Sequence, residues 1–75
     1  MHLRDYLSET SQSQAAFGQK LQPPVSASKV NHWLEGRRRV SLLEALQVLQ
    51  LSDGKVSLQE LADMYRQAEE VRHVA

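Results

Sequence analysis

Apolar residues recur three and four positions apart along most of the chain, which is the spacing of one face of an α-helix. Apolar and polar residues never alternate for long enough to indicate a β-strand. The pattern predicts five helices, at about residues 2–8, 11–21, 26–36, 41–50 and 57–71. We therefore expect an all-α fold, with a frayed tail at about residues 72–75.

Capping signals separate these helices. Segments of the form Ser-x-x-Glu or Ser-x-x-Gln, the capping box that satisfies free N–H groups at a helix start, begin at Ser11, Ser41 and Ser57. Ser26 has the residue type of an N-cap, and Gly36 suits the left-handed conformation that ends many helices. Gly18 lowers the stability of the second helix by about 1 kcal/mol relative to alanine, so we expect another helix to approach closely there.

Length and composition narrow the classes of protein. The 75 residues suffice for one domain, and 41% of them are hydrophobic, which is enough for a globular fold. The absence of cysteine excludes disulfides and thiolate metal sites. No apolar run approaches the roughly 20 residues of a membrane span, and the first residues do not read as a signal peptide. We expect a soluble, cytoplasmic protein with no membrane partner.

The charges are unevenly distributed although the net formal charge is zero. Residues 18–40 carry five basic residues against one acidic residue, whereas residues 41–75 carry three basic residues against six acidic ones. Three of the basic residues are consecutive: Arg37, Arg38 and Arg39. A neutral total therefore conceals a basic centre, and the local field is what steers a charged ligand.

The predicted helix at residues 26–36 has an apolar stripe and an unusual polar face. At 100° per residue, Val30, Trp33 and Leu34 share the stripe, and its spacing favours a core role for Trp33 over a stacking platform for single strands. The opposite face carries Ser28, Asn31, His32 and Glu35. A polar helix face is usually only hydrated. Here the preceding short helix and the basic run that follows favour the reading of base edges in a major groove.

The segment QAAFGQKLQPPVSASKVNHWLEGRRRVS, residues 14–41, resembles the helix-turn-helix of small phage repressors of the Cro type. It is more closely similar to YdaS-type regulators of prophages. The matching positions are Gln14, Gly18, Leu21, Val25, Ser26, Val30, Trp33, Leu34 and Gly36, and the similarity extends from residue 3 to about 62. The resemblance implies a single lambda-repressor-like domain of about five helices over residues 1–75, with the motif at about 14–36. The turn departs from the family pattern, because Gln22, Pro23 and Pro24 replace a glycine and lengthen it by about two residues.

The resemblance also assigns roles to individual residues. The base-contacting positions would be Ser26, Ala27, Ser28, Asn31 and His32, with Lys29 at the edge. The Asn31 amide matches an adenine edge, the Ala27 methyl can pack on thymine, and the charge of His32 would make binding sensitive to pH near neutrality. The phosphate-contacting positions would be Gln14, Arg37, Arg38 and Arg39, which supply affinity and salt dependence rather than sequence choice.

Two alternatives concern the charges and the surplus apolar surface. The arginine run can also be read as a solubilising loop, and Glu35 is expected to pair with Arg38 or Arg39 or to turn outward. The helices at 41–50 and 57–71 carry more apolar surface than a small domain needs. The surplus either packs internally or forms a homodimer face through Met64, Tyr65, Ala68 and Val71. A single reading helix contacts one half-site, so we expect a homodimer at least on DNA.

These features together favour a sequence-specific DNA-binding transcriptional regulator, a Cro-like repressor of phage or prophage origin. It would read the major groove of a double-stranded operator with the helix at 26–35. The alternative is an antitoxin or a phage protein-interaction module on the same scaffold. No phosphate loop, nucleophile elbow, convergent acid pair or metal-ligand spacing is found. We therefore expect no enzyme activity, cofactor, metal or small-molecule substrate.

Overall fold

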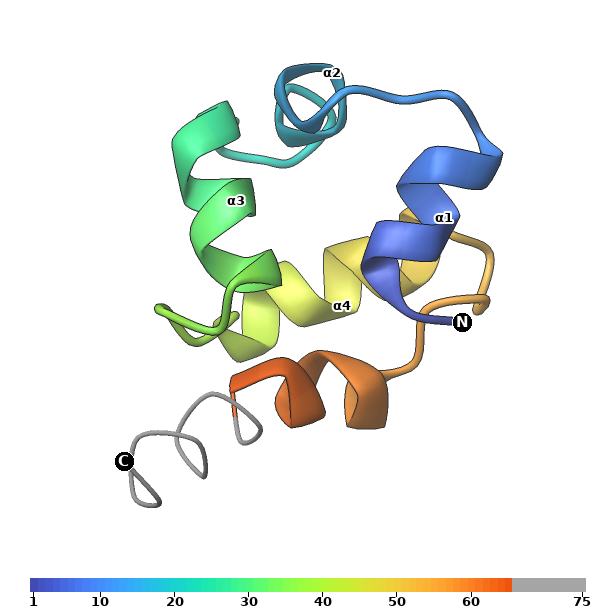
Figure 1. The fold of residues 1–75 in the computed structure, drawn as a ribbon, viewed down its shortest axis with the longest axis vertical. Coiled ribbons are helices and arrows are strands. Elements are labelled where there is room, and N and C mark those ends of the chain that lie inside the picture. Colours follow the sequence, from blue (N-terminus) through green and yellow to red (C-terminus); the bar gives the residue numbers. More distant parts are fainter. Residues whose placement is uncertain (66–75) are drawn as a thin grey trace.

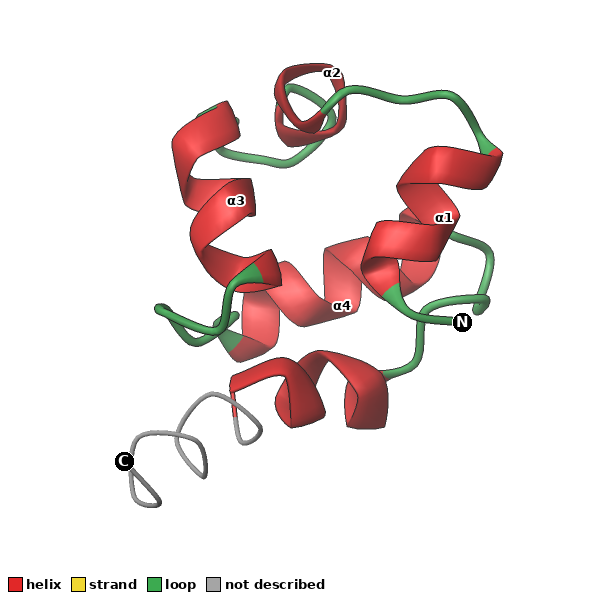
Figure 2. Ribbon diagram, viewed as in Figure 1, coloured by secondary structure: helices red, strands yellow, loops and turns green. Residues whose placement is uncertain are grey.

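The structure, a computed structural model, describes residues 1–65 of the chain. Its helices are α1 (Leu3–Glu9), α2 (Gln14–Gly18), α3 (Ala27–Leu34) and α4 (Leu42–Leu51), followed by a fifth helix at residues 58–65 (Figure 1). No strand occurs within this part of the chain (Figure 2). The expected small all-α fold of the helix-turn-helix type is confirmed. The end of the last predicted helix, residues 66–71, and the predicted frayed tail, residues 72–75, lie outside the described residues.

Most helices begin where their capping signals predict. The Ser26 Oγ accepts from the Lys29 N–H at 3.1 Å, which caps α3. Ser41 and Glu44 form a reciprocal capping box at the start of α4. Glu60 and Ser57 make the same pair of contacts at the start of the fifth helix. The predicted N-termini of α3, α4 and the fifth helix are thus confirmed.

The predicted boundaries of the second helix are wrong at both ends. Ser11 has a φ of +55°, and α2 begins at Gln14 after Ser13, whose Oγ accepts from the Ala16 N–H at 3.0 Å. At the other end, the carbonyl of Gly18 accepts from Val25 at 3.0 Å, so the chain turns there instead of continuing to Leu21. The second serine of the run therefore provides the cap, and contacts across the turn end the helix.

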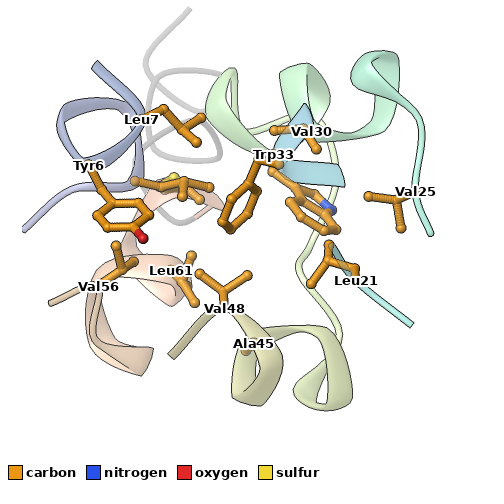
Figure 3. Packing of buried hydrophobic residues seen from close by; sticks show 13 residues of the cluster. Tyr6, Leu7, Leu21, Val25, Val30, Trp33, Ala45, Val48, Val56 and Leu61 are labelled. Atoms are coloured by element: carbon orange, nitrogen blue, oxygen red, sulfur yellow. The ribbon is translucent and has the colours of Figure 1, made fainter. Parts of the chain in front are cut away.

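The hydrophobic core draws on all five helices (Figure 3). Trp33 and Phe17 are its largest fully buried side chains, and Val30 lies beside Trp33 beneath α3. Tyr6 packs edge-on against Phe17 with ring centroids 6.3 Å apart, and its hydroxyl donates to the Leu51 carbonyl at 3.1 Å. The predicted stripe of α3 is confirmed for Val30 and Trp33, which places the opposite side of that helix at the surface.

The leucines of α4 lie mostly outside the core. Leu42, Leu43 and Leu46 are 70%, 62% and 41% exposed, whereas Ala45 and Val48 on the neighbouring side of the helix are buried. The predicted dimer face is wrong for Met64, because this side chain is only 5% exposed and belongs to the core. Tyr65 is half-buried and Arg39 lies over its ring, while positions 68 and 71 lie outside the described residues.

The carboxylate of Glu60 accepts from the N-terminal ammonium of Met1 at 2.7 Å, and this hydrogen bond, with one from the Ser57 backbone, lowers its pKa to about 2. A depressed folded-state pKa stabilises the protein above the ordinary value of 4.5, and that contribution is lost as pH falls towards 2. Glu60→Gln should therefore weaken the pH dependence of the free energy of unfolding over this range. Urea denaturation at several pH values measures it, and identical profiles for both proteins would contradict the assignment.

Candidate nucleic-acid interface

The helix pair α2–α3 is held together by a close backbone contact at Gly18. A Cβ at this position would lie 2.3 Å from the carbonyl oxygen of Val25, closer than packed atoms come. The Val25 N–H donates to the Gly18 carbonyl at 3.0 Å in the same place. The expected close approach is confirmed, although the approaching segment is the backbone just before α3 and not the body of another helix. This contact fixes how α3 lies against α2.

The turn between α2 and α3 is fastened to α4 by one side chain. The Gln47 amide accepts from the Gln22 N–H at 2.7 Å and donates to the Gln22 carbonyl at 2.8 Å. The peptide bond between Gln22 and Pro23 is cis. Gln47 thus satisfies both backbone groups of a turn residue that the helices leave unpaired. This contact could not be predicted, because nothing in the local pattern links two glutamines 25 positions apart.

The residues predicted to read bases lie on the surface side of α3. Ser26 and Ser28 are exposed, and Ala27, Asn31 and His32 are half-buried. Trp33 and Val30 fill the opposite side, within the core. The structure therefore brings five of the six predicted base-contacting residues to one side of α3 or to its N-terminus, where a duplex can approach them.

Lys29 is placed differently from the other five. Its Nζ lies 2.8 Å from Oε2 of Glu44 on α4 and 5.9 Å from the centroid of the Trp33 ring. Burial raises the pKa of Glu44, but hydrogen bonds from Lys29 and Ser41 outweigh this effect and lower its pKa below the ordinary value. To contact a base or a phosphate as predicted, Lys29 would have to leave Glu44. Lys29 instead joins α3 to α4.

A row of polar contacts crosses the outer side of the motif. The Nε2 of Gln14, at the start of α2, donates to Oδ1 of Asn31 at 3.4 Å. The Nδ2 of Asn31 donates to Oε1 of Glu35, and Oε2 of Glu35 lies 3.1 Å from Nε of Arg37. Glu35 therefore pairs with Arg37, and not with Arg38 or Arg39 as predicted. Gln14 is thus a neighbour of Asn31.

The three arginines follow α3 and are all exposed, but they differ in their contacts. Arg37 pairs with Glu35, and the guanidinium of Arg39 lies 4.9 Å from the centroid of the Tyr65 ring. Arg38 is exposed between them. Arg39 is therefore held against the fifth helix, and Arg37 and Arg38 are the arginines nearest to the polar face of α3 in the chain. The ion pair with Glu35 places the charge of Arg37 beside that face.

Three other features of the described residues bear on the class of site. Within residues 1–65, no group of three His, Asp or Glu side chains is arranged to hold a metal ion. An open groove lies between α4 and the turn before α3, and it is lined by Lys20, Gln22, Leu43, Gln47, Gln50 and Leu51. None of the described helices has the length and apolar character needed to cross a membrane.

The candidate site consists of the polar side of α3, the arginines after it and the α2–α3 contact. Its description rests on the geometry of this chain alone. Comparisons of the chain with models of protein families, with curated proteins and with solved structures found no match.

Proposed function

We propose that this protein is a sequence-specific DNA-binding transcriptional regulator, a Cro-like repressor of phage or prophage origin. The observation that carries the proposal is the exposed polar side of α3, which carries donors and acceptors and continues into exposed arginines. In this proposal Ser26, Ala27, Ser28, Asn31 and His32 contact base edges in the major groove. Arg37 and Arg38 neutralise phosphates, with Gln14 and Arg39 at the periphery.

The repressor would act in the cytoplasm by occupying an operator and blocking polymerase. In this proposal it needs no cofactor, metal or small-molecule substrate and catalyses no reaction. The acidic C-terminal half balances the total charge, so attraction to DNA arises from the side of the molecule that carries α3 and the arginines. An antitoxin or phage protein-interaction module remains the second candidate, because the same fold can present α3 to a protein.

Selection of bound sequences from a pool of random duplexes tests the proposal. We expect enrichment of a two-fold symmetric consensus, with half-sites about one helical turn apart. A protein-interaction module would yield no consensus and no affinity that falls steeply with salt. A pool that stays random after repeated rounds, with binding that does not depend on salt, would exclude the DNA-reading function.

The exposed leucines of α4 supply the apolar surface for a second copy of the chain. One α3 reads one half-site, and a two-fold dimer needs a surface that can pack against itself, as a row of leucines can. Replacing Leu42 and Leu46 with Glu should therefore prevent the dimer while leaving the fold intact, because both side chains are exposed. Sedimentation of the protein alone and with its selected duplex measures this. Two chains per duplex for the variant, at parental affinity, would rule out this face.

A further inference from the structure

Asn31 lies between two side chains that each bind one end of its amide. Gln14 Nε2 donates to the oxygen, and the carboxylate of Glu35 accepts from the nitrogen. A carboxylate can only accept hydrogen bonds, so Glu35 selects the NH2 end of the amide. The pairing removes the ambiguity between the two orientations that an asparagine amide otherwise has.

The remaining hydrogen-bonding capacity of Asn31 matches one base. A side-chain amide has two N–H donors and an oxygen with two lone pairs. Gln14 uses one lone pair and Glu35 uses one N–H, so one donor and one acceptor remain. Adenine presents one acceptor, N7, and one donor group, N6–H2, in the major groove. The free pair on Asn31 therefore complements adenine and mismatches guanine, which presents two acceptors.

Arg37 keeps the carboxylate of Glu35 in this position. Its Nε lies 3.1 Å from the second carboxylate oxygen, and the Glu35 side chain is about one-third exposed. The arginine also offsets the negative charge that Glu35 brings towards the phosphates. Glu35 nevertheless lowers the attraction of this surface for any duplex. On electrostatic grounds alone, Glu35 would therefore be unfavourable in a DNA interface.

Building on the proposed function, we infer that Glu35 is a positioning residue. Its carboxylate lowers the affinity of the protein for DNA in general, and by orienting Asn31 it raises the preference for adenine. The two effects have opposite signs, which separates this role from a merely structural one. Loss of the carboxylate raises the non-specific affinity for DNA. It also lowers the preference for adenine at the base pair that Asn31 reads.

The test compares Asn31→Ala, Glu35→Ala and Glu35→Gln on the selected duplex and on copies with one base pair changed. Asn31→Ala identifies the base pair, because preference for adenine should fall about 5- to 150-fold there alone. Glu35→Ala should reduce the same preference at least about fivefold, the lower end of that range, while non-specific affinity rises about threefold. Glu35→Gln removes the charge but keeps an acceptor for Asn31, so affinity should rise while adenine preference largely remains.

Glu9→Gln is the matched control, because Glu9 is an exposed carboxylate on α1, across the molecule from α3 (Figure 1). This control should change neither affinity nor preference. A Glu35→Ala protein that retains parental adenine preference overturns the inference, as does an Asn31→Ala protein with unchanged preference at every position. A parent protein with no DNA affinity overturns the proposed function itself, and the two failures are distinguished by the parental measurement.

Discussion

Replacing Arg37 and Arg38 with Glu should abolish specific DNA binding at physiological salt. The double change removes two phosphate contacts and places two carboxylates beside the backbone, so affinity should fall by about 100-fold or more. Losing two contacts should also reduce the slope of log affinity against log salt by about 2. Both side chains are exposed and outside the core, so the far-UV circular dichroism spectrum should stay unchanged. Fluorescence anisotropy with a labelled duplex over a salt series measures the affinity and the slope.

A single charge reversal at Arg38 can be compared with Lys55→Glu, which changes the net charge by the same amount. Lys55 is exposed in the turn after α4, which lies on the other side of the molecule from α3 (Figure 1). Arg38→Glu should therefore weaken binding much more than Lys55→Glu does. Equal losses from the two variants would mean that only the total charge matters. That result would exclude a phosphate contact at the arginine loop.

Replacing Gly18 with Ala should destabilise the domain strongly. The new Cβ would lie 2.3 Å from the carbonyl oxygen of Val25, and a backbone atom cannot rotate away as a side chain can. Accommodating it requires α2 and the segment before α3 to separate. We expect a loss of about 1–3 kcal/mol in the free energy of unfolding, since this is the usual range for overpacking. Each kcal/mol corresponds to a fall of about 4–8 °C in Tm for a domain of this size.

Gly54 provides a control with the opposite geometry. It has a φ of +80° and no atom within 4 Å of a Cβ, so its requirement is conformational. Asparagine tolerates that conformation, and Gly54→Asn should therefore change Tm only slightly. Thermal unfolding followed by circular dichroism compares the two variants. A Gly18→Ala protein with the Tm of the parent would show that the Gly18–Val25 contact is not tightly packed.

The helix starts that could be predicted from sequence are those with a specific local signal. Ser41 and Ser57 each begin a complete Ser-x-x-Glu capping box, and Ser26 follows Pro23 and Pro24, which cannot continue a helix. The second helix offered Ser11 and Ser13 only two positions apart. Local propensity does not distinguish them, and the packing of α2 against the core decides the cap. The boundary was therefore predicted incorrectly where tertiary contacts outweigh local ones.

The candidate site was predicted from the sequence only as far as helical periodicity reaches. The spacing of Val30 and Trp33 identifies the buried side of α3, and hence the side that carries Asn31. Periodicity cannot show that Lys29 reaches Glu44 or that Gln47 binds the turn at Gln22, because both contacts depend on where α4 crosses the motif. The pairing of Glu35 with Asn31 follows the i, i+4 spacing of a helix and could have been found from sequence. The partners predicted for Glu35 were only arginines.

The buried position of Trp33 makes its fluorescence a measure of folding for every variant of this protein. Trp33 is the sole tryptophan of the chain. Its indole is fully buried on the inner side of α3, opposite the polar residues of that helix. Its fluorescence emission should therefore be shifted to short wavelength in the native protein and move to longer wavelength once water reaches the ring. A single emission spectrum can thus distinguish two reasons why a variant fails to bind DNA. An unshifted spectrum means that only the contacting side chains have changed, and a shifted one means that α3 no longer packs on the core.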